Sequence, residues 1–216
     1  WSHKVWALDL IDGTKRVVAG TGEAGLSGDG GEATRAKLDS PYDIAVDAGG
    51  NLFISDQLNA RVRRVDGKTG VITTVFGNGM CEPTPDGALA VSSSVCSPKG
   101  LHVDRVGRLV VADEVTRKIK RVELDNSVTT IVGAGGYDSQ GDGGPATVAT
   151  FKSPLSVTSD EAGNLFIGES DGDRVRRVDG ASGRISTVAG SGVRGFAGDG
   201  GTATEAAFDG LRGVSR

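Results

Sequence analysis

Residues 153–201 read SPLSVTSDEAGNLFIGESDGDRVRRVDGASGRISTVAGSGVRGFAGDGG, and the pattern of this stretch decides the fold. Short runs that favour β-strands alternate with segments rich in Gly, Asn and Asp; the runs are residues 157–159, 165–167, 174–178 and 185–188. Gly and Asn accept the positive φ that a tight hairpin turn requires. The stretch therefore predicts four short antiparallel strands in succession, followed by a long Gly-rich loop.

The same pattern recurs along the chain. An Asp-Gly pair in the Gly-rich loop keeps its place in every copy, and the aspartates Asp29, Asp86, Asp142 and Asp199 are 57, 56 and 57 residues apart. A fixed period of this length indicates a repeat architecture, and repeated four-stranded units are typical of β-propeller blades. We therefore expect an all-β fold of four-stranded antiparallel blades. The expected divisions are a partial blade at 1–39, full repeats at 40–96, 97–152 and 153–209, and the start of another repeat at 210–216.

Several segments of the unit carry a family resemblance. The Ser-Pro pair at 153–154, GNLFI at 163–167, RVRRVD at 174–179, ISTVAG at 185–190 and GDGG at 198–201 resemble NHL repeats. The chain most resembles the long repeats of bacterial secreted proteins and of the teneurin propeller, over nearly its whole length. The resemblance implies a β-propeller, commonly six-bladed, that serves as a binding platform. Family members differ in function, which includes protein interaction, sensing by kinase ectodomains, RNA binding and peptide-amidating lyase activity, so the fold does not choose among them.

The repeats do not complete a ring. If residues 210–216 were joined to residues 1–39, the resulting blade would lack equivalents of residues 160–170, which include the whole second strand. We therefore expect a segment of about four blades from a larger propeller. A closed four-bladed ring is the less favoured alternative.

The repeated loop aspartates have two interpretations. Asp-rich Gly loops can supply oxygen ligands to Ca²⁺, but each loop here offers one carboxylate, whereas Ca²⁺ takes about six to eight oxygens. An Asp side chain can instead accept backbone N–H bonds and cap the turn that follows it. We favour the structural role and expect no metal site.

An acidic residue after the second strand and basic residues in the third strand recur in each repeat. The candidate pairs are Asp56 with Arg61 or Arg63, Asp113 with Lys118 or Lys120, and Glu169 with Arg174 or Arg176. Because every copy has the same pair, a structural tie is favoured over catalysis, which needs unlike environments around paired groups. The basic strands are expected to present a solvated outer face, where an ion pair is worth at most ~1 kcal/mol.

The two cysteines lie in the one loop that departs from the Gly-Asp-Gly-Gly pattern. Cys81 opens this loop and Cys96 closes it, which predicts a disulfide that pins the loop, with two reduced thiols as the alternative. A disulfide is typical of an oxidising compartment, so we expect an extracellular or organelle-lumenal protein. Loops on a rigid scaffold tolerate variation, and this loop is the best candidate for a unit-specific contact. The candidate contact residues are Glu82, Pro83, Thr84 and Pro85.

His102 lies on a predicted first strand, which faces the central channel in a propeller. It is therefore a candidate channel residue. A zinc site needs three or four ligands and a hydrolase triad needs several partners, and the sequence offers neither around this histidine. The family that this chain resembles includes peptide-amidating lyases, which depend on several histidines around a metal. This stretch does not supply those histidines. We expect no catalytic residue and no cofactor.

Composition limits the partners. The formal net charge is −4, with 28 acidic against 24 basic residues, and no aromatic residues are interleaved with the basic strands. Nucleic-acid binding needs a basic face and stacking residues, so it is not expected. No apolar stretch approaches the ~20 residues of a membrane span, so this segment is not expected to insert into a membrane.

These observations favour a non-catalytic binding or scaffold module of a secreted or lumenal protein. Its partner would be a protein or further blades of the same chain, with a glycan as the alternative. A second hypothesis is a propeller lyase or hydrolase whose metal site at the channel mouth is completed by blades outside this sequence. A third is the extracellular sensor domain of a membrane receptor or kinase.

Overall fold

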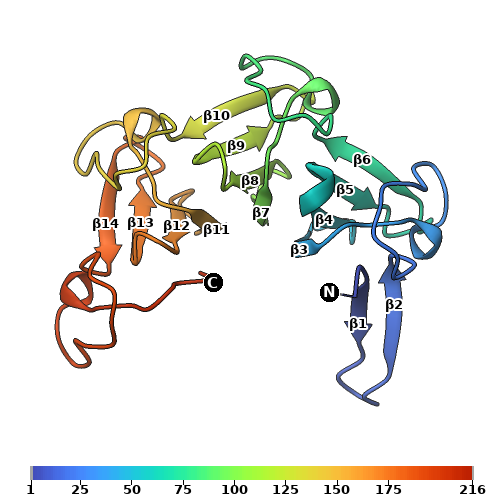
Figure 1. Ribbon diagram of the computed structural model, residues 1–216, viewed down its shortest axis with the longest axis horizontal. Coiled ribbons are helices and arrows are strands. Elements are labelled where there is room, and N and C mark those ends of the chain that lie inside the picture. The colour runs from blue at the N-terminus through green and yellow to red at the C-terminus, as the bar shows by residue number, and fades with distance from the viewer. Residues whose placement is uncertain (1, 216) are drawn as a thin grey trace.

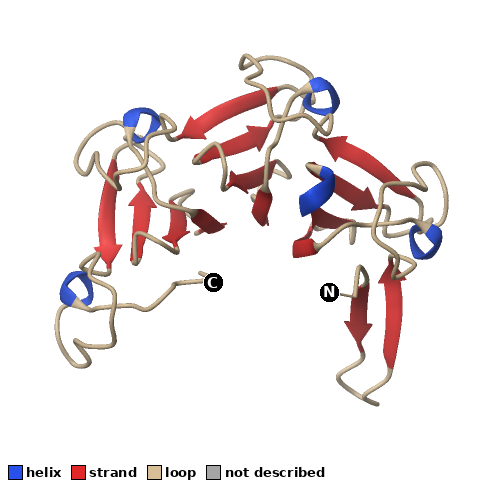
Figure 2. Cartoon of the chain, viewed as in Figure 1, coloured by secondary structure: helices blue, strands red, loops and turns tan. Residues whose placement is uncertain are grey.

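Four antiparallel β-sheets follow one another along an open arc (Figure 1). The structure is a computed structural model that describes residues 2–215. The first sheet has two strands and the other three have four, and the helical turns are short (Figure 2). This all-β architecture confirms the expected β-propeller fold with four-stranded antiparallel blades. We number the sheets blade 1 to blade 4 in chain order.

Within each blade the strands pair in chain order. Blade 1 contains β1 (Val5–Leu8) and β2 (Lys15–Ala19); blade 2 contains β3 (Pro41–Val46), β4 (Leu52–Asp56), β5 (Arg61–Val65) and β6 (Ile72–Phe76). Blade 3 contains β7 (Pro98–Val103), β8 (Leu109–Asp113), β9 (Lys118–Val122) and β10 (Val128–Val132); blade 4 contains β11 (Pro154–Ser159), β12 (Leu165–Glu169), β13 (Arg174–Val178) and β14 (Ile185–Ala189). The 3-10 turns are η1 (Ala33–Arg35), η2 (Gln57–Asn59), η3 (Ala90–Ser92), η4 (Ala146–Val148) and η5 (Ala203–Glu205).

The first strand of each complete blade lies at the inner side of the arc, and the fourth strand lies at the outer side (Figure 1). The inner strands β3, β7 and β11 contact their neighbours directly. Gly100 permits this approach, because a Cβ at this position would lie 2.6 Å from the Cα of Ser156. The arc stays open between β1 and residues 210–215 (Figure 1).

The hydrophobic core lies between neighbouring blades. Three buried clusters join blades 1 and 2, blades 2 and 3, and blades 3 and 4. Each cluster combines the outer strand and following loop of one blade with the face of the next; Phe76 and Val95, for example, share a cluster with Val111 of blade 3. The 3-10 turns η1, η3 and η4 dock into these interfaces through the buried alanines Ala33, Ala90 and Ala146. Each blade therefore depends on its neighbour for stability.

A glycine ends the outer strand of each blade where the chain turns back over it. At Gly133, φ is +99° and a Cβ would lie 2.5 Å from the carbonyl oxygen of Arg117. We expect Gly133→Ala to lower the free energy of unfolding by about 2–3 kcal/mol, because it adds a clash to an unfavourable backbone conformation. Gly143→Ala is the matched control, since φ is +78° but the space around it is open. Urea denaturation of both variants should show the larger loss for Gly133→Ala; equal losses would contradict the clash.

Candidate functional site at the loop end of the blades

Antiparallel pairing brings most of the irregular chain to one end of the blades. The starts of the inner strands, the turns between second and third strands, and both ends of each Gly-rich loop lie at this end, which we call the loop end. The Asp-Gly pair and the 3-10 turn of each loop reach the start of the next outer strand. The hairpin turns at residues 47–51, 104–108 and 160–164 lie at the opposite end. We therefore expect a surface that differs from blade to blade to lie at the loop end.

The repeated Asp-Gly pair clamps each blade to the next one. The glycine N–H donates to the first carbonyl of the next outer strand: Gly30 to Ile72, Gly87 to Val128 and Gly143 to Ile185, at 2.7–2.8 Å. Asp29 and Asp142 accept bonds from the guanidinium groups of Arg63 and Arg176 in the next blade, with Nη2–Oδ1 distances of 2.6 Å. These partners lie in the next blade and not in the turn that follows each aspartate, so the expectation that Asp29 and Asp142 cap that turn is wrong.

The other two loop aspartates differ in their partners. Asp86 accepts bonds from the backbone N–H and hydroxyl of Thr130, both at 3.0 Å. Asp199 is exposed and makes no side-chain hydrogen bond within residues 2–215. Burial raises the pKa of Asp142, but bonds from Thr187 and the charge of Arg176 outweigh it and hold that pKa below its usual value.

The acid–base pairs of the strands form, and they are buried. The distances are 3.3 Å for Arg63–Asp56, 3.4 Å for Lys120–Asp113 and 3.0 Å for Arg176–Glu169. Arg63 and Arg176 are fully buried, because the loop of the preceding blade covers them. The expectation of a solvated outer face is therefore wrong for Arg63, Lys120 and Arg176. Breaking a buried pair is costly because it leaves an uncompensated charge.

The same acids hold the chain where it enters each blade. Asp56 accepts the N–H of Asp39 at 2.7 Å, and Glu169 accepts the N–H of Lys152 at 2.9 Å. Asp113 accepts the N–H groups of Cys96 and Ser97, both at 3.1 Å. Burial raises the pKa of Asp56 by more than its hydrogen bonds and the charge of Arg63 lower it. Each of these acids therefore links the chain that enters the inner strand of its blade to the basic residue of the third strand.

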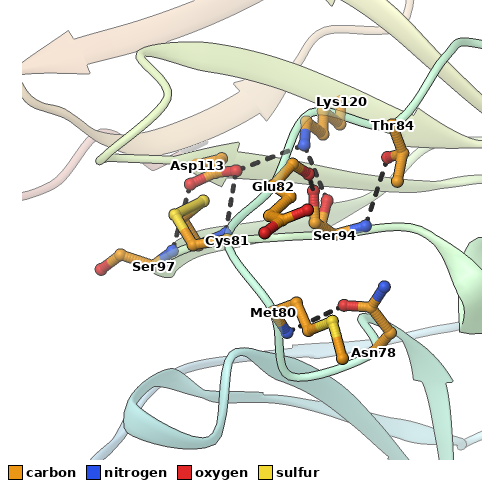
Figure 3. The surroundings of a disulfide bond; sticks show 10 residues. Asn78, Met80, Cys81, Glu82, Thr84, Ser94, Ser97, Asp113 and Lys120 are labelled. Carbon is orange, nitrogen blue, oxygen red and sulfur yellow. Dashed lines mark hydrogen bonds and ion pairs between the residues drawn. A yellow bond between two sulfur atoms is a disulfide. The ribbon is translucent and has the colours of Figure 1, made fainter.

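A disulfide marks the interface between blades 2 and 3. Cys81 and Cys96 are bonded across a separation of 15 residues. Lys120 stands here where the other interfaces have arginine; its Nζ donates to the carbonyl of Ser94 at 2.8 Å and pairs with Asp113. Figure 3 shows the disulfide beside Asp113, with Lys120 reaching toward Asp113 and Ser94. Among residues 2–215, no bond joins Lys120 to Asp86.

Removing the disulfide should destabilise the protein. We expect Cys81→Ser combined with Cys96→Ser to lower the free energy of unfolding by about 3 kcal/mol, because a loop of this length is no longer closed in the unfolded chain. Denaturation without reductant measures the loss. Fully reduced wild-type protein should match the double variant, and a wild-type stability indifferent to reduction would contradict the estimate.

The expected contact loop is fixed at its base and exposed at its tip. Glu82, Pro83 and Pro85 are exposed, whereas Thr84 is half-buried. The hydroxyl of Thr84 accepts the N–H of Ser94 at 3.2 Å, and the hydroxyl of Ser94 donates to the carbonyl of Glu82. The loop therefore presents Glu82 and the two prolines to solvent from a fixed frame.

His102 lies on β7 near the end opposite to the loops. Its Nε2 is 2.7 Å from the hydroxyl of Ser159 on β11, so it bridges two inner strands. Within residues 2–215 no group of three or more His, Cys, Asp or Glu side chains is placed to hold a metal ion. The arrangement around His102 is thus a hydrogen bond between blades.

The titration of His102 offers a test of this environment. Burial lowers the pKa of His102, against a smaller opposing effect of Asp104. Because the fold disfavours the protonated ring, the contribution of His102 to stability is complete above pH 6.5 and decreases as the pH falls below 6.5. NMR titration of the ring protons should give a midpoint below 6.5, and His102→Gln should remove this part of the pH dependence. A midpoint above that value would contradict the burial effect.

A chain of contacts at the loop end runs across three blades. Its links are Tyr42–Lys99 (Nζ to ring centroid, 4.1 Å), Lys99–Glu114 (3.4 Å), Glu114–Ser153 (3.4 Å), Ser153–Asp171 (3.0 Å) and Asp171–Tyr137 (3.1 Å). We call these six residues the rim network. The two tyrosines of the chain are its two ends.

The rim network holds aromatic groups in fixed positions at a partly exposed surface. Tyr137 is 48% exposed, stacks on the guanidinium of Arg117 at 4.6 Å and donates its hydroxyl to Asp171, whose bond raises the pKa of Tyr137. Tyr42 is half-buried, and burial raises its pKa. Lys99 is buried between Tyr42 and Glu114. These contacts restrict the motion of both tyrosines.

Sequence reasoning missed the rim network, although one signal pointed to it. The second residue after the start of each repeat differs in every copy: Tyr42, Lys99, Leu155 and Arg212. Neighbouring positions are apolar or small in most copies. A residue type that varies at a fixed place in a repeat is one that the fold does not specify, and two members of the network, Tyr42 and Lys99, occupy this place.

The fold and the clamps define the chain as a β-propeller built from repeated four-stranded blades. The family model of the Teneurin NHL domain matches residues 8–85. Mouse teneurin-1 is 31% identical over 216 aligned positions, which cover 88% of this chain and 8% of teneurin-1. The chain belongs to the NHL-repeat family of β-propellers, and it spans less than a tenth of the length of this relative.

Solved structures share the fold. A protein of unknown function from Bacteroides thetaiotaomicron superposes with a TM-score of 0.70 at 21% identity, covering 99% of this chain and 48% of the other. A chain of a nidogen/laminin complex superposes with a TM-score of 0.53 at 15% identity, covering 85% of this chain and 54% of the other. The chain thus spans about half the length of these structures.

Proposed function

We propose that this segment is a non-catalytic interaction module that binds a protein partner through the loop end of its blades. The rim network is the observation that carries the proposal. Tyrosine is enriched at protein interfaces, and side chains that are already ordered lose little entropy on binding. The exposed loop of Glu82, Pro83 and Pro85 extends the proposed contact surface, because Pro83 lines one cleft with Thr116 of the loop-end turn of blade 3.

Two further observations support the setting and the kind of partner. The Cys81–Cys96 disulfide favours an extracellular or lumenal location, because such bonds persist in oxidising compartments. One propeller of the same fold was solved in a nidogen/laminin complex, which supports protein binding as a use of this architecture. No helix within residues 2–215 is long and apolar enough to cross a membrane.

Binding to an array of purified extracellular protein domains, with a glycan array in parallel, tests the proposal. We expect wild-type protein to bind at least one protein and Tyr137→Ser to weaken that binding by about tenfold or more, as for a hot-spot residue. Leu124→Ser is the matched control, because Leu124 is 69% exposed at the opposite end of blade 3. Binding confined to glycans, or protein binding that rim and loop variants leave unchanged, would contradict the proposal.

The non-catalytic part of the proposal has its own test. The wild-type protein is incubated with Zn²⁺ and Ca²⁺, dialysed, and analysed for metal and for turnover of ester and lactone substrates. We expect no stoichiometric metal and no turnover that His102→Gln removes. A tightly held metal together with such turnover would support the lyase or hydrolase alternative instead.

A further inference from the structure

Two kinds of clamp hold the loops between blades. At the interfaces of blades 1 and 2 and of blades 3 and 4, an arginine bonds the loop aspartate and the strand acid at once, as Arg63 bonds Asp29 and Asp56. At the interface of blades 2 and 3, Lys120 bonds the strand acid Asp113 but not Asp86. A disulfide is found only in the loop between blades 2 and 3. This interface therefore has a disulfide within its loop and lacks the aspartate–arginine ion pair of the other two interfaces.

The bond is accessible from solvent. Cys81 is exposed, whereas Cys96 is half-buried beside Asp113. Both cysteines line a cleft of about 370 Å³ whose wall also includes Lys118 and Lys120. A reductant can approach Cys81 without opening the hydrophobic core, because Cys81 is exposed and belongs to none of the three buried clusters.

We propose that the Cys81–Cys96 bond is a reducible latch that controls this one loop of the propeller. A dithiol reductant supplies the electrons. One thiolate of the reductant attacks a sulfur of the bond, forms a mixed disulfide and releases the other cysteine as a thiolate, which takes up a proton. The second thiol of the reductant then displaces the first cysteine. The protein ends with two thiols and the reductant with a disulfide.

Opening the latch releases the loop selectively. Without the disulfide, residues 79–95 keep the Asp86–Thr130, Gly87–Val128 and Lys120–Ser94 bonds but have no guanidinium clamp. The loops that carry Asp29 and Asp142 keep their arginine bonds, which do not depend on redox state. Because the released loop carries Glu82, Pro83 and Pro85, reduction would disorder part of the surface that we propose as the contact site. This last consequence rests on the proposed function, whereas the latch itself does not.

Hydrogen exchange followed by mass spectrometry, with and without dithiothreitol, tests the latch on the whole chain. After thiol titration has shown two free thiols, we expect exchange in residues 77–95 to accelerate by about tenfold or more, while residues 20–38 and 133–151 keep their rates. Cys81→Ser with Cys96→Ser should behave like the reduced protein. Unchanged exchange after full reduction, or equal acceleration in all three loops, would overturn the proposal.

A matched variant tests the reason for the selectivity. Lys120→Arg gives this interface the residue that clamps the other two, so its guanidinium should reach Asp86 as Arg63 reaches Asp29. We expect reduced Lys120→Arg protein to keep most of the protection in residues 77–95. If residues 77–95 exchanged equally fast in the reduced variant and the reduced wild type, the latch mechanism would be overturned. No partner enters either experiment, so the latch can stand if the binding proposal fails, and the reverse.

Discussion

Replacing Arg176 by alanine is expected to lower the free energy of unfolding by about 3–5 kcal/mol, because it leaves a buried carboxylate without its counter-charge. Arg176 is fully buried and bonds both Glu169, which is also fully buried, and the loop aspartate Asp142. The variant therefore loses the pair inside blade 4 and the clamp from blade 3 together. Urea or guanidinium denaturation measures the loss.

Two variants make this prediction sharper. Arg177→Ala removes a half-exposed arginine that pairs with Asp179 at 3.0 Å, and should cost no more than ~1 kcal/mol. Arg176→Lys reproduces the residue that the chain carries at position 120, so it should keep the pair with Glu169, lose the bonds to Asp142 and give an intermediate loss. If Arg176→Ala cost no more than Arg177→Ala, the buried clamp would not be a source of stability.

Phe76→Ala should lower the free energy of unfolding by a similar amount, about 3–5 kcal/mol, because it opens a cavity in the core between blades 2 and 3. Phe76 is fully buried in the cluster that joins these blades. Phe196→Ala is the matched control: Phe196 is 90% exposed, so a change within about 0.5 kcal/mol is expected. Thermal or chemical denaturation compares the two, and a similar loss in both would contradict the burial argument.

The core offers a volume-conserving test of the same interface. At the end of blade 2 the outer strand carries Phe76 and the following loop carries Val95, whereas the next blade has the reverse, Val132 and Phe151. We expect Phe76→Val and Val95→Phe to destabilise singly and to compensate partly when combined, because cores tolerate swaps that keep total volume. Additive losses in the double variant would show that these positions do not share one packing space.

The strands could be predicted from the sequence because the hairpin turns are encoded locally. Runs such as residues 165–167 sit between Gly and Asn residues that close turns, and the structure has β12 there. These features need no knowledge of the neighbouring blade.

The burial of the basic strands could not be predicted in the same way. Arg63 and Arg176 lie in strands that alternate basic and apolar residues, a pattern typical of a surface that faces solvent. They are buried because a loop from the preceding repeat folds over them and supplies an aspartate. The contact joins residues 34 positions apart across two sheets, so it becomes visible only once the blades are placed side by side.

The loop residues that clamp each blade come before that blade in the sequence. Cys81 and Asp86 precede the strands of blade 3 in the chain, yet they bond to residues that enter or form that blade. A transplant of residues 97–152 would carry a sheet without the loop that covers it. The interchangeable cassette instead runs from one outer-strand end to the next, as in residues 77–132. Repeat shuffling with junctions at those positions should preserve every clamp.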